Sequence, residues 1–157
     1  LNKICLIDMT PKIANEGEWT LGSFSREEIF SLLEMGVQDW NIASEFFLPY
    51  ALTKGTPTDT EEFRLALQDM QGNTPHIMIF LWIALTAEDF RPVLKDITVP
   101  TLLAYSGDGL ICTPAVGEYL AQRIENSKLV IFPGCGHGLF MDDPVKFNSE
   151  LETFLKE

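Results

Sequence analysis

The sequence lacks several features that would point to particular partners or compartments. Lys and Arg total 11 against 23 Asp and Glu, and the net charge of -12 argues against binding to nucleic acid or an anionic membrane. The three cysteines lack metal-site spacing, which favours a reduced, cytoplasmic setting. No apolar run reaches the roughly 18 residues of a membrane span, and no signal peptide is recognisable. With no ligand cluster, we expect neither a metal nor a cofactor.

What is present is the composition of one folded domain. The 157 residues are 46% hydrophobic and 11% aromatic, enough to bury a core and too apolar for a disordered chain. The sequence begins with Leu1 rather than methionine and enters a strand pattern almost at once, which we interpret as a processed or partial chain.

Strand and helix patterns occupy the two ends of the sequence. The continuous apolar run at 4–7 is typical of a strand buried on both faces. The last part of the chain alternates strand and helix, at 101–105, 114–124, 129–132 and 144–156. This alternation predicts a parallel βαβ unit with a right-handed crossover.

The middle of the chain predicts helices without intervening strands. Residues 12–24 carry turn formers and predict a loop, and Ser25 with Glu28 has the spacing of a capping box. Four helices are expected, at about 25–40, 42–52, 59–72 and 75–90. We interpret them as an inserted helical subdomain whose Trp, Phe and Met side chains form an apolar lid over the sheet. The resulting division of the chain is 1–24, 25–92 and 93–157.

Two polar residues follow predicted strands. Asp108 comes just after 101–105, and His137 lies in a glycine-rich turn after 129–132. If the strands are neighbours, the two turns face each other at a strand spacing of roughly 5 Å. A carboxylate there can hold Nδ1–H of the imidazole and leave Nε2 to accept a proton. Spacing alone equally allows Asp108 to be a turn residue and His137 a surface histidine.

Three segments resemble the C-terminal part of an α/β-hydrolase-fold enzyme: VPTLLAYSGDGLICTP, SKLVIFPGCGHGLFMDDPVKFNSELETFL and, at the start, LIDMTPKI. The resemblance covers essentially the whole chain, with 25–92 similar to the helical cap of that fold. It implies an α/β class, namely a partial hydrolase fold of about three parallel strands with the cap between the first and second. It also implies a serine-type triad that acts on an ester-like small molecule with an apolar portion.

The resemblance assigns the histidine more clearly than the acid. His137 matches the family histidine, whereas the common acid spacing falls on Gly109, one residue after Asp108. Some members place the acid after the sixth strand, and Asp8 lies there. We favour Asp108 as the acid and keep Asp8 as the alternative; Asp8 could instead brace the turn that follows it.

The nucleophile of the family does not occur in these residues. There is no G-x-S-x-G or G-x-C-x-G elbow, and 22–25 has the wrong spacing and follows no strand. Cys135 is better explained as a small residue between glycines than as a nucleophile. His76, at a helix start, is better explained by capping or packing than as part of an acyl pocket.

The sequence therefore predicts the C-terminal half of a serine-type hydrolase that contributes His137 and its acid. The nucleophile and the oxyanion hole are expected from an N-terminal half of the same fold, supplied as a second chain or lost by proteolysis, so the chain alone should be inactive. Two alternatives remain: a non-catalytic module that binds a ligand or a partner strand, and a homodimer that pairs first-strand edges.

Overall fold

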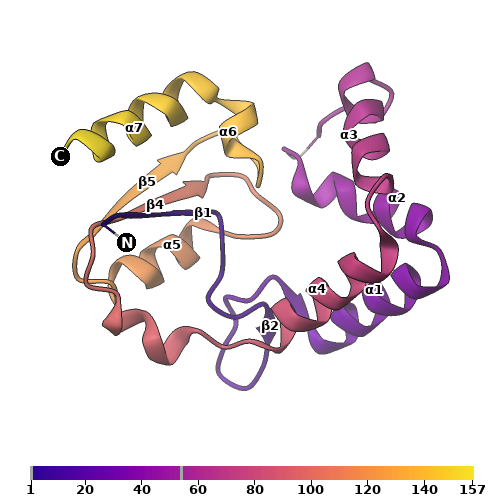
Figure 1. Cartoon of the computed structure of the whole chain (residues 1–157), viewed down its shortest axis with the longest axis horizontal. Coiled ribbons are helices and arrows are strands. Elements are labelled where there is room, and N and C mark those ends of the chain that lie inside the picture. Colours follow the sequence, from indigo (N-terminus) through magenta and orange to yellow (C-terminus); the bar gives the residue numbers. More distant parts are fainter. Residues whose placement is uncertain (1, 54) are drawn as a thin grey trace.

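The computed structural model describes residues 2–53 and 55–157, and its centre is a sheet of three parallel strands (Figure 1). The strands are β1 (Ile4–Ile7), β4 (Thr101–Ser106) and β5 (Ser127–Phe132), in the order β1-β4-β5. All six residues of β4 are buried, because this strand has a neighbour on each edge. The predicted α/β class with three parallel strands is confirmed.

The alternation of side chains along β4 divides the core between two helices. Tyr105 packs with α5 (Pro114–Ala121) on one face of the sheet. Ala104 belongs to a second cluster on the other face, with Phe147 of α7 (Pro144–Lys156). Figure 1 shows the two helices on opposite sides of the sheet. Both faces of the central strand are thus covered, which fixes its position and the direction of its carboxyl end.

Four helices in succession separate β1 from β4, as the sequence predicts. They are α1 (Arg26–Gln38), α2 (Trp40–Ala51), α3 (Glu61–Gln71) and α4 (Pro75–Ala87). The capping box is present: the amide of Glu28 donates to the Ser25 hydroxyl at 3.2 Å, and the amide of Ser25 donates to the Glu28 carboxylate at 2.7 Å. The helices lie on the side toward which the strands run (Figure 1).

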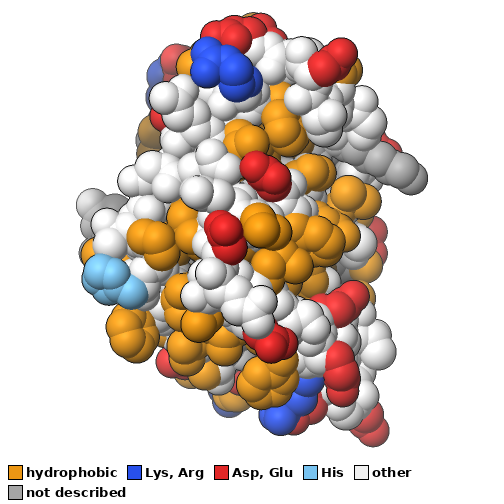
Figure 2. Space-filling model, turned by 90° about the vertical axis from the view of Figure 1, so that its right-hand side faces the viewer, with side chains coloured by type: hydrophobic (Ala, Val, Ile, Leu, Met, Phe, Trp, Pro, Cys, Tyr) orange, Lys and Arg blue, Asp and Glu red, His pale blue; other side chains and the backbone are white. Residues whose placement is uncertain are grey.

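These helices leave many apolar side chains exposed. No residue of α4 is buried, and Phe80 and Leu81 are 68% and 58% exposed. Figure 2 shows hydrophobic side chains gathered over the face of the molecule that lies to the right in Figure 1. Apolar residues occur all round α4 and cannot all turn inward: Trp82 packs on Phe24 and Phe47, whereas Phe80 is exposed. The lid over the sheet stays a prediction.

The loop predicted at 12–24 contains two short strands that the sequence does not predict. Its ends form two short strands, β2 (Ala14–Asn15) and β3 (Phe24–Ser25), which pair in parallel. Trp19 is buried at the tip of the loop, and its Nε1 donates to the carbonyl of Lys12 at 3.0 Å. Strands of two residues leave no periodic pattern, which is why these residues read as irregular.

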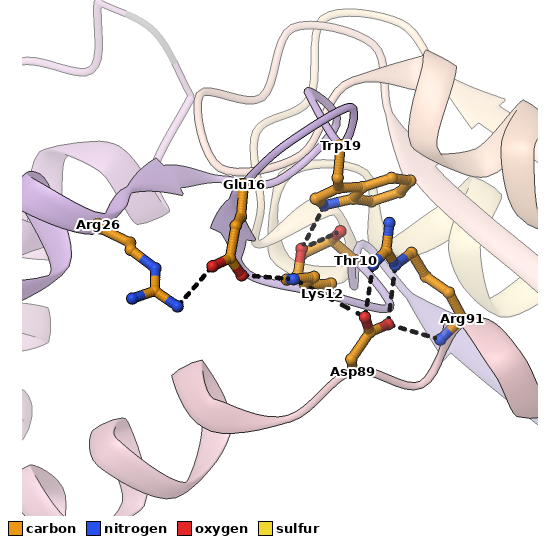
Figure 3. Close-up of polar contacts among 7 residues, drawn as sticks. All are labelled: Thr10, Lys12, Glu16, Trp19, Arg26, Asp89 and Arg91. Atoms are coloured by element: carbon orange, nitrogen blue, oxygen red, sulfur yellow. Dashed lines mark hydrogen bonds and ion pairs between the residues drawn. The ribbon is translucent and has the colours of Figure 1, made fainter.

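A charged network ties this loop to the end of the helical segment (Figure 3). Asp89 accepts a hydrogen bond from Nε of Arg91 at 2.8 Å, and Nζ of Lys12 lies 3.8 Å from the same carboxylate. The Arg91 guanidinium lies over the ring of Trp19, 5.0 Å from its centroid. The 3-10 helix η1 (Arg91–Asp96) starts here and leads the chain back to β4.

The remaining differences concern element ends. A short helix, α6 (Leu139–Asp142), lies between the histidine turn and α7 and was not predicted. β4 and β5 are longer than predicted, and α5 ends three residues before the predicted end at 124. Within the described part of the chain, no helix has the length and apolar character needed to cross a membrane.

Candidate active site

The carboxyl ends of the parallel strands bring three polar residues to one edge of the sheet. Asp8 follows β1 directly, Ser106 is the last residue of β4, and His137 lies in the turn after β5. Because Ser106 pairs with Phe132, the last residue of β5, these two strands end level with each other. Open α/β sheets bind their ligands at this edge.

Asp8 has an unusual backbone conformation at the point where the chain leaves the sheet. Its φ is 47°, in the left-handed region, and its side chain is fully buried. Its amide still donates to the carbonyl of Ala104 at 2.8 Å, and the hydroxyl of Tyr105 donates to the carbonyl of Met9 just beyond it. Aspartate tolerates this region better than most residues, and such conformations gather at functional sites.

The carboxylate of Asp8 accepts three hydrogen bonds inside the protein. Oδ1 accepts from the backbone amide of Ser106 at 2.9 Å and from its hydroxyl at 2.7 Å. Oδ2 lies 2.9 Å from Nδ1 of His137. Buried charge is tolerated only when its lone pairs are satisfied, and Ser106 does this on the side away from the imidazole. Sequence reasoning missed Ser106, since a serine at a strand end carries no distinguishing pattern.

His137 is held at one ring nitrogen, and its side chain is partly exposed. A carboxylate only accepts, so the Nδ1 atom facing Asp8 is assigned the proton, and in the neutral ring the lone pair is then at Nε2. The side chain is 29% exposed, whereas that of Asp8 is 0% exposed. A buried acid behind a partly exposed imidazole is the arrangement of a histidine that exchanges protons.

Asp108, the favoured acid, does not contact the imidazole, and the expectation that it holds Nδ1–H differs from the structure. Its Oδ2 accepts from the amide of Gly134 at 2.8 Å, and its own amide donates to the carbonyl of Cys135 at 3.2 Å. Asp108 therefore braces the turn that carries His137, while Asp8, the alternative, lies on the ring.

Packing at Gly109 explains why the loop after β4 does not present an acid at the family's common spacing. A Cβ atom at this position would lie 2.1 Å from Oγ of Ser106 and 3.0 Å from the carbonyl of Cys112. The space that a side chain would need is taken by the hydroxyl that binds Asp8. A side chain at position 109 would therefore displace the hydroxyl that supports the acid after β1.

The other residues weighed from the sequence lie away from this contact. Cys135 is buried and packs with Phe132 and Leu139, and burial raises the pKa of its thiol. His76 is exposed on the first turn of α4. Among the residues that the structure describes, no three His, Cys, Asp or Glu side chains gather as a metal site would require.

An apolar cavity of about 190 Å³ lies among the four helices. Its wall comes from all four of them and is built of Leu32, Leu33, Gly36, Trp40, Ala43, Phe47, Met70, Met78, Ile79, Leu81, Trp82 and Leu85. His137 does not line it. The cavity can hold an apolar group, but it does not place that group at the imidazole.

A family model described as alpha/beta hydrolase fold matches residues 56–144. A pimeloyl-acyl-carrier protein methyl ester esterase of Nitrosospira multiformis is 23% identical over 158 residues, which cover 99% of this chain and 60% of that protein. A strigolactone esterase of Pisum sativum is 26% identical over 160 residues, which cover 99% of this chain and 58% of that protein. The chain spans about three fifths of the length of these curated relatives.

Solved structures show the same arrangement of elements. An esterase from Exiguobacterium antarcticum superposes with a TM-score of 0.88 at 26% identity, covering 99% of this chain and 57% of that one. A hydrolase from Oleispira antarctica gives a TM-score of 0.90 at 23% identity, with coverages of 99% and 56%.

Proposed function

Since this chain belongs to the alpha/beta hydrolase fold family, we propose that it supplies the histidine and the acid of an ester-hydrolysing triad, His137 and Asp8. The observation that carries the proposal is the 2.9 Å contact between Nδ1 of His137 and Oδ2 of the buried Asp8. The printed names of two relatives, both esterases, support the ester-type chemistry.

In this proposal each residue has one task. Nε2 of His137 takes the proton from the nucleophile's hydroxyl as the oxygen attacks the ester carbonyl carbon, and returns it to the leaving alcohol. The same nitrogen then takes a proton from water as the water oxygen attacks the acyl intermediate. It returns that proton to the nucleophile's oxygen as the bond between that oxygen and the acyl carbon breaks and the acid is released. Asp8 keeps the proton on Nδ1 and stabilises the imidazolium formed in both steps. Ser106 holds Asp8 in place.

The nucleophile and the oxyanion donors come from polypeptide outside these 157 residues, in our proposal an N-terminal half of the same fold present as a second chain. The sheet supports this. β1 pairs only with β4 among the strands that the structure describes, and its four residues are half-buried where those of β4 are buried. A further strand along β1 would complete its hydrogen bonds and cover its side chains.

The substrate in this proposal is a small ester-like molecule with an apolar portion. Residues 25–92 act as the cap over the core formed by 1–24 and 93–157, and the many apolar side chains of α1 to α4 support an apolar substrate group. The mechanism needs no metal or cofactor, because the histidine and the oxyanion donors handle the proton and the charge.

The test begins with native mass spectrometry of the purified chain, to find a co-purifying polypeptide that contains a nucleophile elbow. The assembly is then assayed with p-nitrophenyl butyrate. We expect His137→Ala and Asp8→Asn to lower kcat by about 10⁴-fold, the order typical of a lost triad member. Asp108→Asn should retain activity within about tenfold. Full activity in His137→Ala would refute the proposal.

A second candidate is a self-associating fragment in which two copies pair their β1 edges. The open edge of β1 is the observation that favours it. A homodimer that dissociates on Leu6→Pro would support this function; a monomer in solution would exclude it.

A further inference from the structure

The segment that follows α2 lies against the turn that carries His137. This segment, residues 51–53, contains the last residue of α2 and the two residues after it, whereas the turn 134–138 follows β5 at the sheet edge. Figure 1 shows the end of α2 beside α6, which follows that turn. Two parts of the chain more than eighty residues apart therefore meet next to the imidazole.

Polar contacts join the two segments at Gly136, the neighbour of His137. The amide of Gly136 donates to Oδ2 of Asp142 at 2.8 Å and to Oγ1 of Thr53 at 3.1 Å. The hydroxyl of Thr53 in turn donates to Oδ2 of Asp142 at 2.6 Å. One hydroxyl thus links the end of α2, the histidine turn and α6.

The backbones at this point are in direct contact. A Cβ atom on Gly136 would lie 2.6 Å from the carbonyl carbon and oxygen of Leu52 and 2.6 Å from the amide nitrogen of Thr53. Gly136 is buried and is accommodated only because it has no side chain. A shift of the end of α2 would therefore move the turn as well.

We propose that Thr53 is a positioning residue for His137, through which the helical group sets the orientation of the imidazole. This inference rests on the proposed function, since it matters only if His137 exchanges protons. Asp8 fixes the ring from the sheet, and Thr53 fixes the backbone beside it from α2. Movement of the helices over a substrate would then change the orientation of Nε2 relative to the nucleophile. A small displacement of a catalytic group lowers the reaction rate strongly.

The role can be measured in the chain itself by ¹⁵N spectroscopy of the His137 ring, which reports the nitrogen that carries the proton. In the wild type we expect the Nδ1–H form. Thr53→Val keeps the shape and removes the hydroxyl, and should move the Nδ1 resonance away from its wild-type position. Thr53→Ser keeps the hydroxyl and should restore the wild-type signal.

Thr153→Val is the matched control, because the Thr153 hydroxyl donates only to the carbonyl of Ser149 within α7, at 2.8 Å. Thermal unfolding of every variant shows whether the chain remains folded. If Thr53→Val does not fold, Gly136→Ala, which forces the two backbones apart, should shift the resonance in the same direction.

The outcomes separate the two claims. If the wild-type ring lacks the Nδ1–H form, Asp8 does not hold the imidazole of His137, and the proposed function is refuted as well. A normal wild-type ring with folded Thr53→Val and an unmoved resonance overturns the positioning role alone. A shift of equal size in Thr153→Val would also overturn it, because the effect would then be a general response to loss of a threonine hydroxyl.

Discussion

Nδ1 of His137 and Oδ2 of Asp8 lie 2.9 Å apart although 129 residues separate them in the sequence. The contact exists because β1 and β5 flank β4 on opposite edges and all three strands end on the same side. Asp8 reaches across the end of β4, where Ser106 binds its other oxygen. Ser106, at the end of the central strand, thus holds the acid Asp8 in place.

Ser106→Ala should destabilise the fold more than an equally buried serine in a neutral setting. The variant removes the hydroxyl that donates to the Asp8 carboxylate, and hydrogen bonds to charged groups contribute about 2 kcal/mol. Ser44→Ala is the control, since the fully buried Ser44 hydroxyl donates to the carbonyl of Trp40 within α2. Urea unfolding should show a loss of about 2 kcal/mol for Ser106→Ala and about 1 kcal/mol or less for Ser44→Ala. Equal losses would contradict a charge-assisted bond.

Gly109→Ala should destabilise the chain through the same serine. The added Cβ would lie 2.1 Å from Oγ of Ser106, and overpacking of this kind costs about 1–3 kcal/mol. Gly36→Ala is the control: in α1, its Cβ would meet atoms no closer than 3.7 Å, and alanine stabilises a helix by about 0.5–1 kcal/mol relative to glycine.

In a Ser106→Ala background the cost of Gly109→Ala should fall, because the hydroxyl that causes the collision is gone. A double-mutant cycle measured by urea unfolding tests this coupling. Strictly additive losses would show that the two positions do not share the space.

The sequence predicts the sheet and its helices well because their signals are local. Apolar runs predict the strands, and the Ser25 capping box predicts the start of α1. The choice of acid is different, since it depends on the backbone at Asp8. A φ of 47° turns the chain out of the sheet so that its carboxylate meets β4, and no pattern of residue types encodes that angle. The sequence favours Asp108 over Asp8 because Asp108 lies one residue from the acid spacing that is common in the family.

The contact of Thr53 with the histidine turn lay beyond sequence reasoning for another reason. It depends on where α2 ends relative to a turn formed much later in the chain, and the intervening helices determine that distance. The need for glycine at position 136 likewise follows only from the backbone of Leu52 packed against it. Local propensity says nothing about such encounters.

The Asp89–Arg91 contact should contribute stability that depends on pH. The hydrogen bonds of the Arg91 side chain lower the pKa of Asp89 to about 2, below its ordinary value of about 3.9. A depressed pKa in the folded state gives stability that is present above about pH 4 and lost as the pH falls toward about 2.

Thermal unfolding at pH 5 and at pH 2.5 of the wild type and Asp89→Asn measures this contribution. The variant should have a lower Tm than the wild type at pH 5, and the difference in Tm between the two should be smaller at pH 2.5. Glu125→Gln, at an exposed carboxylate, is the control. A gap that stays the same at both pH values would contradict the linkage.

Cys112 should resist alkylation in the folded chain. Burial raises the pKa of its thiol to about 12, with the nearby Asp8 adding to the effect, and only the thiolate reacts. Iodoacetamide at pH 8 should label the half-buried Cys5 first and leave Cys112 unlabelled until the chain unfolds in guanidinium chloride. Peptide mass spectrometry reads the order, and labelling of Cys112 as fast as Cys5 would contradict it.

The most direct test of the central claim is the ring-nitrogen spectrum of His137 in three proteins: the wild type, Asp8→Asn and Asp108→Asn. If Asp8 holds the imidazole, the wild type and Asp108→Asn share an Nδ1–H resonance, and Asp8→Asn loses it because an amide no longer holds that proton as a carboxylate does. Loss of the resonance in Asp108→Asn, with Asp8→Asn unchanged, would assign the acid to Asp108 and contradict the account.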